Sequence, residues 1–285
     1  MTRIPCRERT FPLWLAFEFE YQYMFALRWL RHFLERLGRE HTLSIWQDAF
    51  RNYDSQLLDQ ILGAKWEKAP ELASDKVELG LAKFTADLFP APVERVSGEQ
   101  AREIILAMPP FKQIRERFAT LDVVSETTTY EALHLFRDGL ALLAESVLDR
   151  CGKAGELVIY DALLEEWSPG KREPTPVAEF MAQRKARFTS QPAEMDIFQA
   201  GLEVELVHAS EHEVVTRVTE CEWARYYRER HPRVGYMMAC SMDNAAYRSF
   251  NDRIRLQRTS TLMEDGVECD FRVYGLPDSD LEAKH

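Results

Sequence analysis

The sequence predicts an α+β fold, in which a helical N-terminal half is followed by a small antiparallel sheet with helices packed on it. Two observations lead to this class. Through most of the N-terminal part, apolar residues recur every three or four positions, which is typical of amphipathic helices. From about Gly201 the period falls to two, as in Leu202, Val204 and Leu206, which is typical of half-buried strands.

The composition is that of an ordinary globular protein. The 285 residues are 46% hydrophobic and 29% charged, with a formal net charge of −11. No dense run of Lys and Arg occurs, so we expect no nucleic acid as a partner. The aromatic stretch Phe11–Leu37 carries too many charges to span a bilayer, and no export signal precedes it. We therefore expect a cytoplasmic protein with free cysteines and no membrane partner.

Residues 1–92 are expected to form a helical, aromatic-rich arm or subdomain. Phe11–Leu37 predicts one long helix that ends at Gly38 and is apolar on more than one face. Such a helix is buried in a core or against a second copy, so the arm is a candidate homodimer surface. Ile45–Ile61 predicts a second amphipathic helix, and the proline-rich run Phe89–Pro92 predicts a boundary after it.

Residues 93–276 are expected to form an α+β domain, followed by a flexible tail at 277–285. Thr128 and Glu131 fit a capping box at the start of the clearest helix, which Gly152 ends. Asp265 and Gly266 predict a turn between the last two strands. The other expected helices are Ser97–Met108, Leu157–Trp167, Ala178–Phe188, Glu222–Arg230 and Asp243–Phe250, and the expected strands are Leu202–Leu206, Val214–Glu220, Ile254–Met263 and Val267–Tyr274.

Three of the five cysteines lie in the last third of the chain, each near a carboxylate. Cys221 lies between an expected strand and an expected helix, where helix N–H groups would lower the thiol pKa and favour a nucleophilic thiolate. Cys240 and Asp243 are three residues apart and share a face if helical. Cys269 and Asp270 point to opposite faces of an expected strand, so Cys269 is expected to be a pocket wall. The same patterns are also typical of buried structural thiols and helix-capping carboxylates.

A zinc site made of the three cysteines and a histidine such as His231 is an alternative. Zinc ligands usually come in close pairs of the C-x₂₋₄-C kind, whereas these cysteines are separated by 19 and 29 residues. No glycine-rich phosphate- or dinucleotide-binding motif occurs either. We therefore expect neither a metal nor a cofactor.

Four short motifs lie in the last third of the chain: Val218–Cys221, Cys240–Asp243, Arg258–Thr261 and Gly266–Phe271. In residue type, order and spacing they resemble the L-2-amino-thiazoline-4-carboxylic acid hydrolase family. The clear resemblance covers about residues 202–274, and the helices from about Ser97 extend it more weakly. It implies that a small cyclic isothiourea or amidine-like carboxylic acid is opened by hydrolysis, giving a carbamoylated cysteine.

The resemblance also implies roles for individual residues. Cys240 or Cys221 would add to the amidine carbon, and Asp243 or Asp270 would activate water to release the product. Cys240 ranks above Cys221 because a base, Asp243, lies beside it in the chain. Direct attack by an aspartate-activated water is the alternative route. Arg258 would bind the substrate carboxylate. The other expected substrate-binding residues are Thr259, Thr261 and Cys269.

Two other classes of function remain open from the sequence. One is a metal-dependent biosynthetic enzyme on a related scaffold. The other is a small-molecule or redox sensor module whose cysteines bind a metal or respond to oxidation. Metal analysis of the purified protein separates both from a thiol hydrolase.

Overall fold

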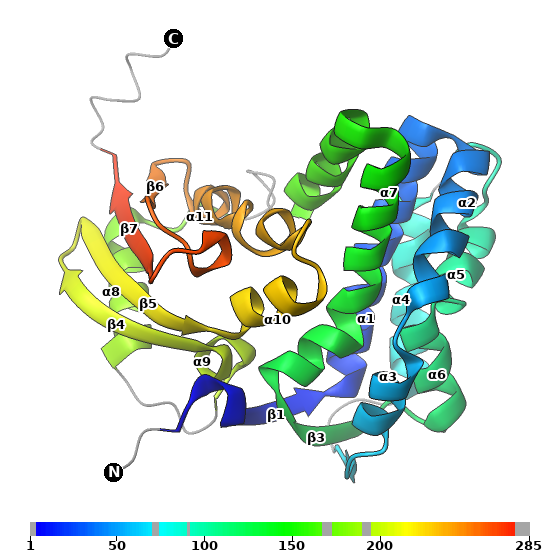
Figure 1. Ribbon diagram of the computed structural model, residues 1–285, viewed down its shortest axis with the longest axis horizontal. Helices are drawn as coiled ribbons and strands as arrows, with labels where there is room; N and C mark the ends of the chain where they lie inside the picture. Colours follow the sequence, from blue (N-terminus) through cyan, green and yellow to red (C-terminus); the bar gives the residue numbers. More distant parts are fainter. Residues whose placement is uncertain (1–3, 70–73, 90–91, 167–172, 190–194, 277–285) are drawn as a thin grey trace. The chain divides into compact units, whose positions relative to one another are not determined.

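The computed structural model describes residues 4–69, 74–89, 92–166, 173–189 and 195–276. Contacts divide the chain into two compact units, Thr10–Ala162 and a second one made of Met1–Arg9 with Leu163–His285, and each is described by itself. The predicted α+β class is confirmed (Figure 1): the N-terminal half is mostly helical, and a four-stranded antiparallel sheet lies in the C-terminal half.

The Thr10–Ala162 unit has an aromatic core. Phe19, Trp29 and Phe33 have no exposed surface, and the ring of Phe19 meets that of Phe111 edge-on at 5.0 Å. The aromatic arm therefore buries these rings inside its own unit, and a homodimer through it stays a prediction. The helices are α1 (Leu15–Leu37), α2 (Arg39–Ala49), the single turn η2 (Phe50–Asn52), α3 (Ser55–Leu62), α4 (Ser74–Leu88), α5 (Gly98–Leu106), α6 (Pro109–Arg117) and α7 (Thr129–Glu166).

The first helix begins later than predicted. Thr10–Trp14 forms strand β1, which pairs antiparallel with β3 (Val123–Thr128), and β3 also pairs with β2 (Glu67–Lys68). Along β1 burial alternates from residue to residue, so one face of the strand is covered. The prediction of helix over the first residues of Phe11–Leu37 was wrong, because pairing with a distant strand satisfies their backbone groups better than a helical turn does.

The predicted capping box at the start of α7 is confirmed. The backbone N–H of Thr128 donates to the Glu131 carboxylate at 2.9 Å, and the N–H of Glu131 donates to the Thr128 hydroxyl at 3.3 Å. Gly152 interrupts the helix as predicted, with a φ of 53° that glycine adopts readily. The boundary expected after residue 92 stays a prediction; it falls between α4 and α5, which contact each other.

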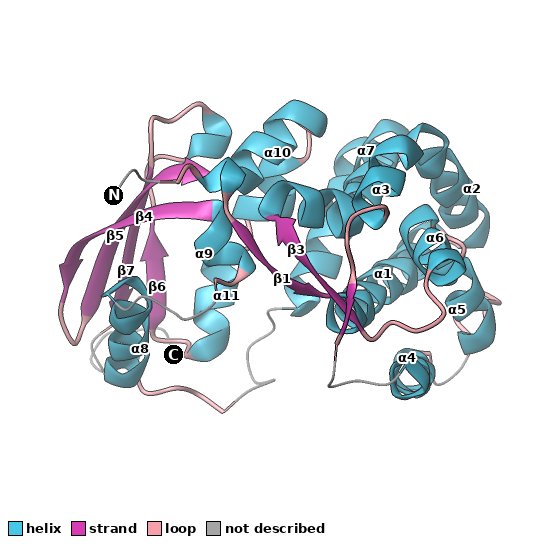
Figure 2. Ribbon diagram, turned by 90° about the horizontal axis from the view of Figure 1, so that it is seen from below, coloured by secondary structure: helices cyan, strands magenta, loops and turns pink. Residues whose placement is uncertain are grey.

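The second unit is built on an antiparallel sheet with the strand order β4-β5-β7-β6 (Figure 2). Helices α8 and α11 cover one face, where Phe180 packs 5.1 Å from Phe250 and joins a core with Val214 and Val273. The strands are β4 (Leu202–Ala209), β5 (Glu213–Cys221), β6 (Ile254–Gln257) and β7 (Cys269–Gly275), and the helical segments are η1 (Cys6–Glu8), α8 (Val177–Thr189), α9 (Ile197–Gly201), α10 (Glu222–Arg230), η3 (Tyr236–Cys240), α11 (Asp243–Phe250) and η4 (Leu262–Glu264).

The last two strands are shorter than predicted. β6 ends at Gln257 and β7 begins at Cys269, so residues 258–268 form a long connection instead of a tight turn at Asp265 and Gly266. Backbone N–H groups of this connection donate to side chains at the start of β7 rather than to a ladder partner. The expected tail at 277–285 lies outside the described residues.

Candidate active site

Two of the predicted cysteines lie where the backbone changes conformation. Cys221 ends β5 and caps α10, and its Sγ accepts the backbone N–H of Ala224 at 3.4 Å. The predicted strand-to-helix junction is therefore confirmed. Cys240 ends η3, which is a π-helical turn. Such turns are rare and recur at functional sites. No pattern in the sequence predicted this one.

Asp243 and Arg258 form an ion pair next to Cys240. The Arg258 guanidinium donates to the Asp243 carboxylate and, through Nη2, to the backbone carbonyl of Cys240 at 3.0 Å. Its centre lies 5.2 Å from the ring centroid of Phe271, and only 8% of the side chain is exposed. The Asp243 side chain keeps 30% of its surface exposed. Arg258 therefore binds protein groups in this structure, and its predicted binding of the substrate carboxylate stays a prediction.

The three thiols and Asp243 act on one another electrostatically. Burial raises the pKa of the Cys221 thiol to about 12, against the lowering effect of the Ala224 N–H, and the charges of Cys269 and Asp243 add to the rise. Burial and the Asp243 carboxylate raise the pKa of Cys240, and burial raises that of Cys269. The expected lowering at Cys221 is thus wrong, because desolvation outweighs the helix N-terminus. The resting thiols are protonated at neutral pH.

The Asp243 carboxyl is also shifted. Burial raises its pKa, and the guanidinium groups of Arg258 and Arg184 oppose the rise. Arg184, on α8, lies 4.8 Å from the ring centroid of Tyr247, which is one turn after Asp243 on α11. A carboxyl with a raised pKa exchanges protons closer to neutral pH than an ordinary aspartate does. Arg184 lies in an expected helix, but no pattern marked it as part of the site.

Asp270 and Thr259 hold the start of the 258–268 connection. Asp270 accepts hydrogen bonds from the Thr259 N–H at 2.9 Å, the Thr259 hydroxyl at 2.6 Å and the Ser260 N–H at 2.6 Å. Burial acts to raise the pKa of this carboxyl, but the hydrogen bonds from Thr259 and Ser260 together lower it. Both groups already have protein partners, and the predicted roles of Asp270 as a base and Thr259 as a substrate ligand stay predictions.

Thr261 and Cys269 shape the rest of this connection. The Thr261 hydroxyl accepts the Glu264 N–H at 3.1 Å and so caps η4. The Cys269 thiol is buried and accepts the Leu262 N–H at 3.2 Å. Binding of substrate by Thr261 or Cys269 stays a prediction.

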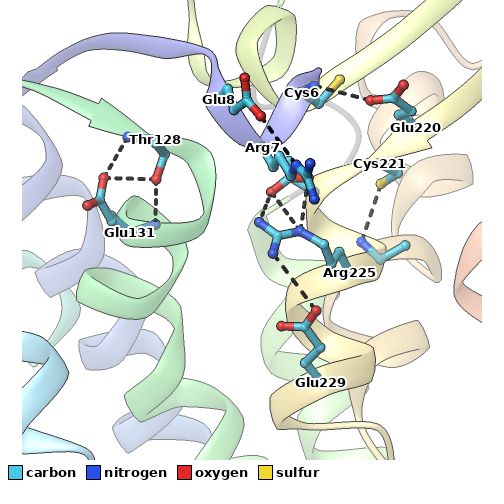
Figure 3. Close-up of polar contacts among 11 residues, drawn as sticks. Cys6, Arg7, Glu8, Thr128, Glu131, Glu220, Cys221, Arg225 and Glu229 are labelled. Carbon is cyan, nitrogen blue, oxygen red and sulfur yellow. Dashed lines mark hydrogen bonds and ion pairs between the residues drawn. The ribbon is translucent and has the colours of Figure 1, made fainter. Parts of the chain in front are cut away.

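A cavity of about 580 Å³ opens beside Cys221. Figure 3 draws several of its lining side chains, among them Arg7, Cys221 and Arg225. This volume lies within the usual range for small-molecule sites. Among the described residues, Cys221 lines the cavity and Cys240 and Cys269 do not. The periodicity and motif spacing of the sequence did not predict that the arginines of this cavity lie close together. The charged residues of the lining are Arg7, Arg225, Arg228, Glu220, Glu222 and Glu229.

Within the described ranges, no three His, Cys, Asp or Glu side chains lie together in an arrangement that could hold a metal ion. No helix in those ranges is both long enough and apolar enough to cross a membrane.

Comparison with known proteins matches the C-terminal part of the chain to one family. No curated protein and no solved structure matches. The matched segment contains Cys221, Cys240, Asp243 and Arg258, and it supports a hydrolase. Residues 136–273 match the model of the L-2-amino-thiazoline-4-carboxylic acid hydrolase family, and the resemblance predicted from the four motifs is confirmed.

Proposed function

We propose that the protein hydrolyses a small cyclic isothiourea or amidine-like carboxylic acid, such as 2-amino-thiazoline-4-carboxylate. The family match supports a hydrolase. One observation supports this choice of chemistry. Arg258 holds the Asp243 carboxylate beside Cys240, and the charge of that carboxylate acts on the thiol of Cys221, which lines the cavity. A thiol at a cavity and a carboxyl with a raised pKa can supply the nucleophile and the proton carrier that this hydrolysis needs.

In the first half-reaction, Cys221 is the nucleophile, because it lines the cavity and Cys240 does not. Asp243 does not line the cavity either, but its charge acts on the Cys221 thiol, so in this scheme it exchanges protons with the cavity through an intervening water. The proton of Cys221 passes to the Asp243 carboxylate while the sulfur bonds to the amidine carbon. The bond between that carbon and the ring sulfur then breaks, and the ring sulfur takes the proton from Asp243. The product of this step is an isothiourea that joins Cys221 to the opened substrate, and no net proton is gained or lost.

In the second half-reaction, Asp243 takes a proton from water as the oxygen adds to the same carbon. The bond to Cys221 breaks, and the proton returns to its sulfur. One water is consumed, and an N-carbamoylated cysteine leaves. In this scheme Arg258 positions Asp243, and Asp270 positions the connection that carries Arg258.

The raised thiol pKa sets a condition on this route. Forming a free Cys221 thiolate at pH 7 costs about 7 kcal/mol, so proton transfer must accompany carbon–sulfur bond formation. Direct attack by water activated at Asp243 avoids this cost and is the competing route. Rapid-quench mass spectrometry separates the two routes, because only attack by Cys221 leaves the opened substrate attached to the peptide that contains it.

The substrate is tested by incubating the protein with 2-amino-thiazoline-4-carboxylate and identifying the product by mass spectrometry. We expect N-carbamoyl-cysteine to form with the wild type and not with Asp243→Asn. If the wild type leaves the compound unchanged, this substrate is wrong. Stoichiometric zinc or iron in the active protein would instead support the metal-dependent or sensor alternatives.

A further inference from the structure

We propose that Arg7 binds the substrate carboxylate in the cavity beside Cys221, an inference that rests on the proposed function. Arg7 lines this cavity together with residues of β5 and α10 (Figure 3). It lies outside the segment 136–273 that matches the family. The N-terminal segment of this chain therefore adds a substrate-binding group that the matched segment does not contain.

Residues on both sides of Arg7 are bound to the sheet of the same unit. On one side, Cys6 is fully buried, and its N–H donates to the Glu220 carboxylate at 3.1 Å. On the other side, the Arg9 guanidinium donates to the Leu202 carbonyl at 3.3 Å. Anchors at positions 6 and 9 hold the Arg7 backbone at the cavity, so that only its side chain loses freedom when a ligand binds.

The other two arginines of the lining are held by protein groups. Arg225 Nε donates to Glu222 at 3.1 Å, and its guanidinium also pairs with Glu229 at 3.8 Å. Arg228 pairs with Asp265 and donates to the Leu262 carbonyl at 3.0 Å. Turning either guanidinium toward a ligand would break these contacts.

Arg7 is less restricted. Its Nε lies 3.6 Å from the Glu8 carboxylate, longer than a good charge-assisted hydrogen bond, and 66% of its side chain is exposed. Its planar guanidinium can therefore donate two parallel hydrogen bonds to a carboxylate, the geometry that arginine prefers.

The charges of the lining point to a ligand with both signs. The cavity carries three arginines and three glutamates, so a multiply charged anion such as phosphate would meet carboxylates as well as cations. A carboxylate at Arg7 with a basic amidine toward Glu229 satisfies both groups, because the Glu229 side chain is 51% exposed and its pairing with Arg225 is as long as 3.8 Å. The other two glutamates of the lining already have protein donors: Glu220 accepts the Cys6 N–H, and Glu222 accepts from Arg225.

The test compares wild type, Arg7→Gln and Arg7→Lys on two substrates: 2-amino-thiazoline-4-carboxylate and 2-amino-thiazoline, which lacks the carboxylate. We expect Arg7→Gln to raise KM for the acid about 10- to 100-fold with a nearly unchanged kcat, because the anchor binds ground and transition states alike. Arg7→Lys should recover part of the loss. On 2-amino-thiazoline, wild type and Arg7→Gln should have the same kcat/KM. The matched control is Glu8→Gln, which keeps Arg7 and should not raise KM.

An unchanged KM for the acid in Arg7→Gln overturns the anchor and leaves the hydrolase proposal standing. An equal loss on both substrates also overturns it, because the defect then does not depend on the carboxylate. If the wild type turns over neither compound, calorimetric titration with the acid decides. If the acid binds to the wild type and binds more weakly to Arg7→Gln, the role of Arg7 is supported although the proposed reaction is not. If the acid does not bind to the wild type, both the role of Arg7 and the proposed function are overturned.

Discussion

Arg258 donates to the carboxylate of Asp243, which lies 15 residues earlier in the chain, and the same guanidinium donates to the Cys240 carbonyl. One side chain thus joins the end of a π turn, the start of α11 and the connection after β6. The planar guanidinium can make both contacts at once, which the single ammonium of lysine does less well.

Replacing Arg258 should destabilise the protein, because Asp243 would be left partly buried without its main counter-charge. We expect Arg258→Ala to lower the free energy of unfolding by about 2 to 4 kcal/mol, measured by urea denaturation. The matched control is Arg272→Ala, which removes an arginine that is 52% exposed and pairs with Glu213. Its cost should stay below about 1 kcal/mol. Equal costs for the two variants would contradict the structural role given to Arg258.

Asp270→Asn distinguishes a positioning carboxylate from a catalytic base. An asparagine oxygen can still accept N–H groups of Thr259 and Ser260, so we expect kcat to fall less than about tenfold. A general base would lose about 10²- to 10⁴-fold. Steady-state kinetics measure the difference, and a loss in the second range would return Asp270 to the role of base.

Cys6 should make stability depend on pH in the alkaline range. Burial raises the pKa of its thiol from 9.0 to about 11, so above pH 9 the unfolded chain loses this proton while the folded chain keeps it. The contribution of this thiol to the free energy of unfolding is fully present below pH 9. It falls by about 1.4 kcal/mol per pH unit as the pH rises toward 11.

The measurement is urea denaturation of wild type and Cys6→Ala between pH 7.5 and about 10.5. The difference in free energy of unfolding between wild type and variant should be constant below pH 9. Above pH 9 the wild type should lose stability relative to the variant, since an alanine side chain has no proton to lose. A difference that stays constant over the whole range would contradict the raised pKa.

Local patterns predicted the elements whose ends are set by nearby residues. The capping box at Thr128 and Glu131 and the junction at Cys221 are examples. Strand β1 could not be predicted in this way, because its partner β3 begins more than a hundred residues later. The long connection 258–268 was missed for a related reason: side chains beyond it, such as Asp270, determine its path.

The candidate site shows the same limit. Motif spacing indicated Cys221, Cys240, Asp243 and Arg258, and the structure brings these groups into one electrostatic cluster. The direction of the thiol pKa shifts could not be predicted, because it depends on how deeply the folded chain buries each sulfur. Arg7 could not be found either, since its place at the cavity depends on contacts with strands two hundred residues away.

The most direct test of the proposed chemistry is kcat/KM for hydrolysis of 2-amino-thiazoline-4-carboxylate by wild type, Cys221→Ala, Cys240→Ala and Asp243→Asn. We expect Cys221→Ala and Asp243→Asn to lose about 10³-fold or more, because each removes a group that takes part in bond breaking. Cys240→Ala should keep activity within about tenfold of wild type, since its thiol does not line the cavity. Wild-type activity in Cys221→Ala, or a loss confined to Cys240→Ala, would contradict the assignment of Cys221 as the nucleophile.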